Sequence, residues 1–145
     1  ATLLKALGID HERFTYQYKC LTAAPSAILL PNDMALRYQD LKLLNSGKMR
    51  YQSGAKQEFT YGGKITENIV QALARIVICE QMLAIQALPD FEVVLTVHDE
   101  IIAISDDTNP EERMNQMLDI MRTAPQWAPN LPLDAEGGWD YCYSK

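Results

Sequence analysis

Three adjacent polar residues, His98, Asp99 and Glu100, separate two short apolar runs in the second half of the chain. The runs, residues 93–97 and 101–104, are rich in β-branched side chains and predict two strands joined by a turn. Such a hairpin would hold one carboxylate rigidly at its tip, beside a second carboxylate and an imidazole. Mg²⁺ prefers oxygen ligands and binds through one or two carboxylates together with substrate phosphates. The tip is therefore a candidate metal site, and a plain solvated turn is the alternative interpretation.

A second polar group begins the longest helical pattern of the chain. Its members repeat at i, i+3, i+4 and i+7 and therefore share one helix face: Lys64, Glu67, Asn68 and Gln71. An ordinary exposed helix face accounts for this pattern. Amide and ammonium groups also hydrogen-bond the sugars, phosphates and minor-groove edges of nucleic acid. The stripe is therefore also a candidate DNA contact.

A locally basic stretch precedes this stripe. Its cationic and aromatic residues are Arg37, Tyr38, Lys42, Lys48, Arg50, Tyr51 and Lys56. The solvated edge of a β-meander explains them, and contact with a nucleic-acid backbone is the alternative. The whole chain has a net charge of -6, which argues against a free-standing nucleic-acid binder. A metal-bearing part of a larger nucleic-acid enzyme stays open, because acidic residues gather where metals bind.

Two helices must position these groups. Residues 65–88 contain neither Pro nor Gly, and their apolar residues recur at spacings of three and four, which predicts one long helix. Because this helix is apolar around much of its surface, we expect it to be largely buried, with Thr66 as its N-cap. Asn109 and Pro110 predict the N-cap and the first residue of a shorter amphipathic helix that ends near Arg122.

Short strands account for most of the remaining chain. Turn residues between apolar runs predict a hairpin over residues 27–38, a meander over 40–52 and a further strand at 57–61. Residues 131–136 alternate in character and predict a final strand, whereas residues 10–24 have a mixed pattern that we interpret as irregular or helical. The predicted fold class is α+β, with a small antiparallel sheet packed on one long buried helix and a shorter amphipathic helix.

The composition narrows the class of protein further. The 145 residues include three widely spaced cysteines, so neither a zinc site nor a disulfide framework is predicted. We judge that no run is long or apolar enough to span a bilayer and expect a cytoplasmic protein with no membrane partner. The chain begins with Ala1, and residues 2–7 resemble the interior of a helix, so we expect a fragment of a longer protein.

Four segments, in this order and spacing, resemble the C-terminal part of family A DNA polymerases, and above all the bacteriophage members of that family. They are LPNDMALRYQDL, YGGKITENIVQALAR, VVLTVHDEIIAI and APNLPLDAEGGW. The resemblance extends from about residue 27 to the end of the chain. It implies a palm-like sheet in which VHDE is motif C, and a helix that follows the minor groove of the primer-template duplex.

The resemblance also implies roles for the residues at the hairpin tip. Asp99 would be the motif C aspartate that binds the catalytic metal, and Glu100 the adjacent, less critical carboxylate. His98 would lie near the primer terminus.

Three residues of the long helix are implied to contact DNA. Gln71 matches the minor-groove glutamine of the family. Asn68 matches its asparagine, although the spacing to Gln71 is one residue shorter here. Lys64 stands where the family often has a basic residue.

Two motifs of family A have no counterpart in this sequence. One is the DYSQIE-like segment with the second metal-binding aspartate, and the other is the fingers helix whose Lys and Arg bind the incoming triphosphate. Both precede the matching region in the family. The resemblance therefore implies that residues 1–62 are the rear of the fingers with a small meander, and that residues 63–145 are the second half of the palm, within one compact fragment.

The implied function is template-directed nucleotidyl transfer by a DNA-directed DNA polymerase with two Mg²⁺ ions. Its partners would be primer-template DNA, dNTPs and the remaining polymerase domains, in the host cytoplasm if a phage encodes it. We expect the isolated chain to be inactive, because the second aspartate and the triphosphate-binding helix are missing.

Two other classes stay open. One is a non-catalytic interaction module or the subunit of a split polymerase. The other is an HD-type metal phosphohydrolase, suggested by the pair His98 and Asp99. That class resembles an all-helical fold with additional His ligands, and His11 is the only other histidine of the chain.

Overall fold

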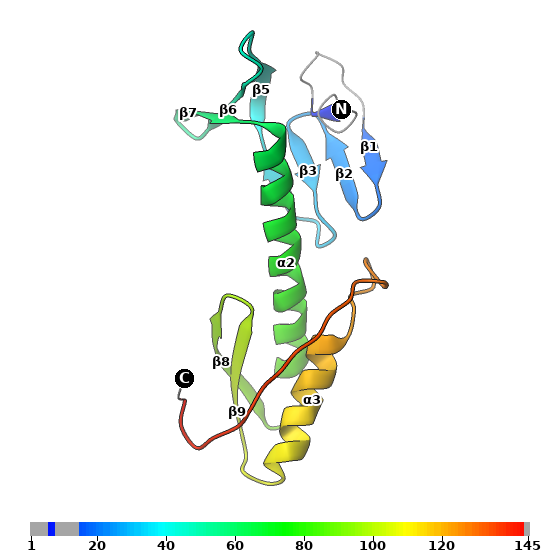
Figure 1. Ribbon diagram of the computed structural model, residues 1–145, viewed down its shortest axis with the longest axis vertical. Coiled ribbons are helices and arrows are strands. Elements are labelled where there is room, and N and C mark those ends of the chain that lie inside the picture. Colours follow the sequence, from blue (N-terminus) through cyan, green and yellow to red (C-terminus); the bar gives the residue numbers. More distant parts are fainter. Residues whose placement is uncertain (1–5, 8–14, 144–145) are drawn as a thin grey trace. The chain divides into compact units, whose positions relative to one another are not determined.

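The computed structural model of the protein describes residues 6–7 and 15–143 and has the predicted α+β fold (Figure 1). Small antiparallel sheets combine with two helices, one of them long. The chain divides into two compact units, residues 1–73 and 74–145, and the division falls inside the long helix. Each unit is described by itself. The boundary expected between residues 62 and 63 stays a prediction.

The first unit contains a four-stranded antiparallel sheet in the order β1-β2-β3-β4. Its strands are Tyr16–Tyr18, Leu21–Ala24, Ala27–Leu29 and Ala35–Arg37. The hairpin predicted over residues 27–38 is confirmed as β3 and β4. The prediction of irregular or helical structure was wrong for residues 16–24, which form β1 and β2, whereas residues 10–14 lie outside the described residues.

A second antiparallel sheet of the first unit has the order β5-β6-β7 and confirms the predicted meander. Its strands are Gln39–Leu43, Met49–Ser53 and Lys56–Thr60. Gly47 and Gly54 occupy the two connecting turns with φ values of 77° and 58°. Glycine adopts this left-handed backbone without the steric cost that a Cβ atom brings, so the two turns are well matched to their residues.

The long helix α2, Gly62–Gln86, begins three residues earlier than predicted. Thr66 donates a hydrogen bond from Oγ1 to the Gly62 carbonyl oxygen at 3.0 Å. Thr66 therefore lies inside the first helical turn, and its predicted role as N-cap was wrong. A threonine hydroxyl that bonds back to the carbonyl four residues earlier is common within helices.

Only part of the surface of α2 is buried, and the buried side changes along the helix. Ile65, Ile76 and Ile85 are at most 5% exposed, whereas Val70 and Leu83 are 59% and 64% exposed. Ile65 and Leu83 lie about five helical turns apart on the same side of α2, yet only Ile65 is buried, so the expectation of a largely buried helix was wrong.

The length and apolar character of α2 correct a second expectation. With a mean hydropathy of 1.4, the helix Gly62–Gln86 is long and apolar enough to cross a membrane, so the judgement that no run meets these criteria was wrong. The core helix of a water-soluble protein meets the same criteria. Length and hydropathy alone therefore give only weak evidence of a membrane span.

The second unit combines the end of α2 with the hairpin β8–β9 and the helix α3. The bounds are Phe91–Val97 for β8, Glu100–Ser105 for β9 and Pro110–Arg122 for α3. A core of Ile85, Phe91, Ile101 and Met117 joins these four elements. The hairpin and the shorter helix are both confirmed, and each strand is longer than predicted.

The start of α3 differs in detail from the prediction. Asn109 has a left-handed backbone, with φ 56° and ψ 61°, and its side chain makes no capping hydrogen bond. Asn109 therefore occupies the predicted N-cap position, and its carbonyl oxygen accepts from the Arg113 N–H at 3.1 Å, but its side chain does not cap the helix. Pro110 does open the helix, where its missing N–H costs nothing, and two glutamates in the first turn suit the positive end of the helix dipole.

The C-terminal segment, residues 131–143, forms no strand in the described part of the chain, so the predicted final strand was wrong. Pro132 has no N–H to give to a strand ladder. Asp134 instead accepts a hydrogen bond from Arg122 Nε at 3.1 Å. This contact attaches the segment to the end of α3, beside which it runs in Figure 1.

Candidate functional site

The turn between β8 and β9 holds His98 and Asp99 at its tip, and both side chains are exposed. His98 has a φ of 55°. A positive φ at the first central residue is what tight two-residue hairpin turns require, and histidine adopts it more readily than most residues. Glu100 is partly buried and forms the first pair of β9, opposite Val97. The structure thus brings the three predicted residues together, with two of them in the turn and one in the strand.

A β-bulge decides which side chains of the hairpin face the core. Val93 lies opposite Ala103, but Leu95 lies opposite Ile102, so Val94 is the extra residue. Before the bulge the odd-numbered residues of β8 face the core, and after it the even-numbered ones do. Leu95 consequently points outward and is 49% exposed.

Gln86, the last residue of α2, fixes the base of the hairpin. Its Nε2 donates to the Phe91 carbonyl oxygen at 3.2 Å, and its Oε1 accepts from the Val93 backbone N–H at 2.9 Å. One amide thus satisfies a donor and an acceptor of β8, as a neighbouring strand would do. The contact lies immediately before the bulge.

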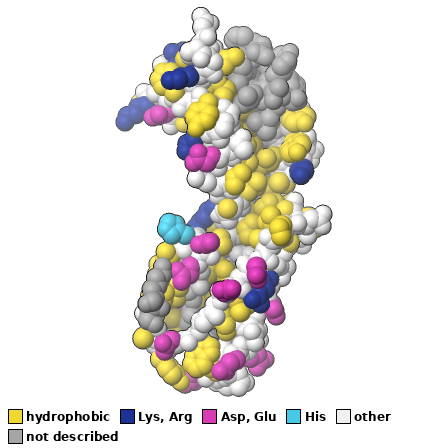
Figure 2. Space-filling model, in the orientation of Figure 1, with side chains coloured by type: hydrophobic (Ala, Val, Ile, Leu, Met, Phe, Trp, Pro, Cys, Tyr) yellow, Lys and Arg dark blue, Asp and Glu magenta, His cyan; other side chains and the backbone are white. Residues whose placement is uncertain are grey.

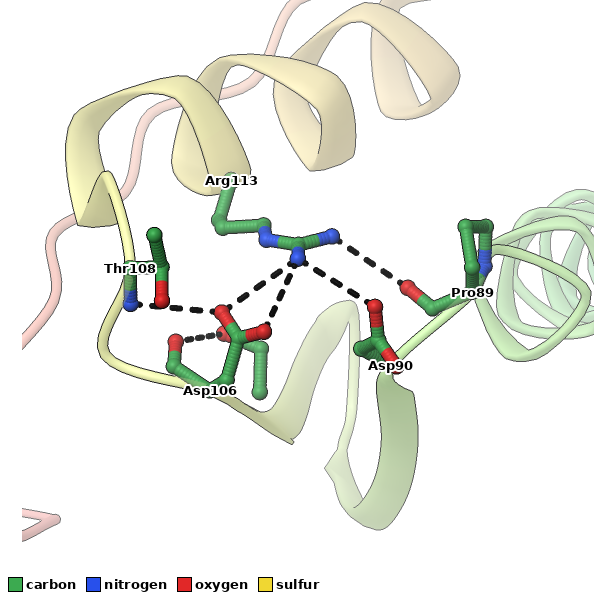
Figure 3. A network of polar contacts seen from close by, with 6 residues as sticks. Pro89, Asp90, Asp106, Thr108 and Arg113 are labelled. Atoms are coloured by element: carbon green, nitrogen blue, oxygen red, sulfur yellow. Dashed lines mark hydrogen bonds and ion pairs between the residues drawn. The ribbon is translucent and has the colours of Figure 1, made fainter.

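Arg113 of α3 forms the second attachment of the hairpin base (Figure 3). Its guanidinium donates to both carboxylate oxygens of Asp106 at 3.2 and 3.3 Å, to Asp90 Oδ2 at 3.4 Å and to the Pro89 carbonyl oxygen at 3.3 Å. It also lies 5.6 Å from the centre of the Phe91 ring. Since Asp90 precedes β8 and Asp106 follows β9, one side chain holds both ends of the hairpin.

The donor set at the tip suits a cation that takes its other ligands from elsewhere. Asp99 offers an exposed carboxylate, and within residues 6–7 and 15–143 no three His, Cys, Asp or Glu side chains are grouped to hold a metal ion. Structural and catalytic zinc sites need three or four such side chains. Mg²⁺ needs only one or two carboxylates when substrate phosphates complete its shell. The residues fit the second kind of site and not the first.

The same observation bears on the HD-type interpretation. That interpretation requires a cluster of His and Asp ligands, and the described residues contain no such group. His98 and Asp99 also lie on a hairpin and not on a helix.

The polar stripe of α2 forms a small network in the first unit. Glu67 Oε1 accepts from Lys64 Nζ at 2.9 Å and from Gln71 Nε2 at 3.3 Å. The hydrogen bond to Glu67 and its negative charge raise the pKa of the Lys64 ammonium. All three side chains are exposed, and exposed ion pairs contribute little to stability. A ligand can therefore replace these contacts at low cost.

Asn68 bonds to Tyr38 and not to the Glu67 network. Its Nδ2 donates to the Tyr38 hydroxyl oxygen at 3.0 Å. Burial raises the pKa of that hydroxyl, and the hydrogen bond from Asn68 opposes the rise. The Tyr38 ring meets Tyr51 edge-on, with centroids 5.3 Å apart. The structure therefore groups Lys64 with Gln71 and assigns Asn68 to the packing of α2 against the meander.

Sequence reasoning did not single out Gln86 or Arg113. Gln86 carries no local signal, because its partners come from the next element and depend on the hairpin's register. Arg113 has a weak signal: it is a lone cation that follows Asp106, Asp107, Glu111 and Glu112 within eight positions.

The two units differ in charge. Residues 1–73 contain nine basic and six acidic residues, whereas residues 74–145 contain four basic and thirteen acidic residues. Figure 2 shows this on one face, with basic side chains mainly over the β5–β7 sheet and acidic ones mainly over β8, β9 and α3. The basic stretch and the carboxylate-bearing hairpin thus belong to different units.

Comparison with known proteins gives one informative similarity. Over 78 residues the chain is 37% identical to a DNA polymerase of Bacillus phage SP02. The matching region is 54% of this chain and 12% of that polymerase, so the chain is similar to a small part of a much longer protein. No family model matches the chain. No solved structure matches it either.

Proposed function

We propose that the chain is part of a family A DNA polymerase of the phage type and carries the palm hairpin with the motif C aspartate. The observation that carries this proposal is the hairpin itself. Asp99 stands exposed at the tip of two strands whose base is held by Gln86 and Arg113. The similarity to part of the phage SP02 DNA polymerase supports the reaction class, nucleotidyl transfer.

Each residue of the tip has a role in this proposal. Asp99 supplies an oxygen ligand to Mg²⁺, and a second aspartate joins it from another part of the polymerase. When bound, Mg²⁺ would supply positive charge to stabilise the negative charge that develops on the attacking and leaving oxygens. Glu100 adds a second carboxylate at the start of β9, and His98 lies beside the primer terminus. The tight turn restricts the backbone of these three residues and so fixes the positions from which their side chains project.

The polar stripe of α2 would contact the minor groove of the primer-template duplex. Lys64 Nζ and Gln71 Nε2 now donate to Glu67 Oε1. In a complex with DNA they could donate to acceptors in the minor groove instead. Asn68 keeps its bond to Tyr38 and holds the helix in place, so we assign it a supporting role. The polymerase would act on DNA and dNTPs in the host cytoplasm, together with its other domains.

A chimera tests the proposal directly. Residues 62–122 of this chain, from the start of α2 to the end of α3, replace the corresponding segment of the phage SP02 polymerase, and primer extension is measured. We expect extension, and we expect Asp99→Asn to reduce it by at least about a thousandfold because a ligand of the catalytic metal is removed. Asp107→Asn, an equal change of charge beyond the end of β9, is the control and should act like the parent. A chimera that extends primers equally well with Asp99→Asn contradicts the proposal.

A second measurement covers the case of a chimera that does not fold. Mn²⁺ is added to the ¹⁵N-labelled 145-residue chain, and the broadening of amide signals is followed by NMR. We expect the amides of residues 98–100 to broaden at lower Mn²⁺ concentration than those of residues 106–107. Equal broadening at both acidic segments would mean that the tip has no preference for a metal, and the proposal would fail.

One observation favours a second candidate, a non-catalytic module or split-polymerase subunit that works by docking. The outward face of β8–β9 carries large apolar side chains, and Leu95 and Ile104 are 49% and 59% exposed. A stable module should run as a single monodisperse species in size-exclusion chromatography. A fragment cut from a larger palm should self-associate through this face, because an exposed apolar sheet surface favours association.

A further inference from the structure

Two rows of side chains cross the β5–β7 sheet on the same face, because directly paired residues of antiparallel strands point the same way. The first row is Lys42, Arg50 and Phe59, and the second row is Gln39, Gln52 and Gln57. We call these six residues the outer face of the sheet.

The opposite face of the sheet holds its buried side chains. Leu41, Met49 and Thr60 are 4%, 3% and 5% exposed. The Tyr51 ring, on the same side, packs against Tyr38. None of the six residues of the outer face is buried, so solvent or a ligand can reach it, whereas the opposite face is buried in part and exposes Leu43 and Glu58.

The chemistry of the outer face combines cations, amides and one aromatic ring. Phe59 is 63% exposed and lies on the edge strand β7, opposite Arg50. Arg50 Nη1 donates to the neutral Gln57 Oε1 at 3.3 Å, so its guanidinium keeps its full charge beside an amide. Glu58, the acidic residue of β7, is exposed, but it is paired with Tyr51 and therefore points to the other face of the sheet.

A shallow hollow of about 120 Å³ is bordered by four residues of this face, by Asp40 and by Tyr51, whose ring lies on the other side. Its lining residues are Asp40, Lys42, Arg50, Tyr51, Gln52 and Gln57. Asp40 sits where the register of β5 shifts, and it is the carboxylate among them. Two cations against one carboxylate leave the hollow with a net positive charge in a protein of net charge -6. Such a local excess attracts an anion.

We propose that the outer face of the β5–β7 sheet binds single-stranded DNA, with Lys42 and Arg50 on phosphates and Phe59 stacked on an unpaired base. Sheet surfaces that bind single strands combine a cationic track with an exposed ring in this way. The three glutamines provide donors and acceptors for base edges. A duplex hides the flat faces of its bases, so the exposed ring favours a single strand. The choice of DNA over RNA rests on the proposed function.

Fluorescence anisotropy with the whole 145-residue chain tests this proposal. The probe is a labelled dT₁₂ oligonucleotide in buffer with about 0.1 M salt, EDTA and no nucleotide. Phe59→Leu keeps an apolar side chain but removes the ring, and we expect binding to weaken about 5- to 100-fold, the range for removal of one stacked base. The logarithm of the binding constant falls as the logarithm of the salt concentration rises. The double change Lys42→Gln with Arg50→Gln should make this dependence shallower by about 0.7 for each phosphate that the protein no longer neutralises.

Lys56→Gln is the matched control. Lys56 is opposite Ser53 at the end of the same sheet and belongs to the other side of the register. The substitution Lys56→Gln removes one positive charge, as Lys42→Gln does. We expect its binding to stay within about twofold of the parent, because exposed charges away from the bound strand are screened by salt. Circular dichroism checks that each variant is folded.

Three results would overturn the proposal. They are equal weakening by Lys56→Gln and Lys42→Gln, no effect of Phe59→Leu, and tighter binding of a 12-base-pair duplex or of U₁₂ RNA than of dT₁₂. Because the assay contains EDTA, its outcome does not depend on metal chemistry. An active chimera together with a failed binding assay would leave the proposed function standing and remove only this inference.

Discussion

The β5–β7 sheet and the β8–β9 hairpin are both antiparallel, but they differ in the polarity of their faces. The first sheet has an apolar buried face and a polar outer face. The hairpin has large apolar side chains on both faces, since Ile101 and Phe91 are buried while Ile104 and Leu95 are largely exposed, although Glu92 and Glu100 share the outward face. Strands that alternate in polarity suit a sheet with one face in solvent, and strands that are apolar throughout suit a sheet covered on both sides.

The difference extends to charge and to the proposed ligands. The β5–β7 sheet belongs to the unit with an excess of basic residues, and the hairpin to the unit with an excess of acidic residues. Basic surfaces attract phosphates, and carboxylates attract metal ions. The two proposals therefore give the sheets complementary ligands: a DNA backbone for the β5–β7 sheet and a metal cation for the hairpin.

The largest effect should come from the buried face of the hairpin. Ile101→Ala should lower the free energy of unfolding by about 2–5 kcal/mol, because it removes a core side chain and leaves a cavity. Ile104→Ala makes the same change on the outward face and should cost less than about 1 kcal/mol. Urea unfolding followed by tryptophan fluorescence measures both, since Trp127 and Trp139 lie in this unit. Equal losses would mean that the two faces are not distinct.

The next effect should come from the attachment of the hairpin to α3. Arg113→Ala should lower the free energy of unfolding by about 1–3 kcal/mol, because it removes several hydrogen bonds to charged and carbonyl groups together. The Arg113 side chain is 19% exposed, whereas that of Arg122 is 44% exposed. Arg122→Ala is therefore the control and should cost less than about 1 kcal/mol. The same urea titration decides the order, and a reversed order would contradict the role of Arg113.

A smaller and more local effect should follow from changes at Gln86. Gln86→Ala removes two hydrogen bonds to β8 and should cost about 1 kcal/mol. Gln86→Glu keeps an acceptor for the Val93 N–H but removes the donor to the Phe91 carbonyl, so it separates the two interactions. Hydrogen exchange of the Val93 amide should quicken in the first variant and stay slow in the second. Slow exchange in Gln86→Ala would show that the side chain does not protect this amide.

The smallest effect concerns the first unit at high pH. Burial raises the pKa of Tyr38 above its ordinary value of 10.0. The folded chain keeps this proton while the unfolded chain loses it, so the contribution is complete below pH 10 and declines as the pH rises through the folded pKa. Tyr38→Phe should make the loss of stability above about pH 10 shallower. Unfolding followed by far-ultraviolet circular dichroism at about pH 9 to 11 measures the slopes, and identical slopes would contradict the assignment.

The sequence predicts those elements whose signals are local. The meander follows from its turns, where Gly47 and Gly54 take the left-handed backbone. The start of α3 follows from Pro110, and the hairpin tip from the break between two β-branched runs. In each case a few neighbouring residues restrict the backbone before any tertiary contact forms.

The elements that sequence reasoning missed depend on less typical residues or on distant contacts. The turns beside β2 contain Lys19 and Ser26 at positive φ, where a glycine would have been the usual signal. The bulge at Val94 leaves no mark in composition. The support of the candidate site by Gln86 and Arg113 depends on tertiary register, and so the tip was predictable but its attachment was not.

The bulge at Val94 gives the two strands of the hairpin unequal tolerance to a change in length. The residues on either side of Val94 already pair with adjacent residues of β9, Ala103 and Ile102. Deletion of Val94 would therefore straighten the ladder and leave every other side chain of β8 on its present face. Strand β9 has no extra residue between its pairs, so deletion of one residue there would force the chain toward the tip to slip and exchange its faces. One strand can thus shorten by a residue without moving the tip, and its partner cannot.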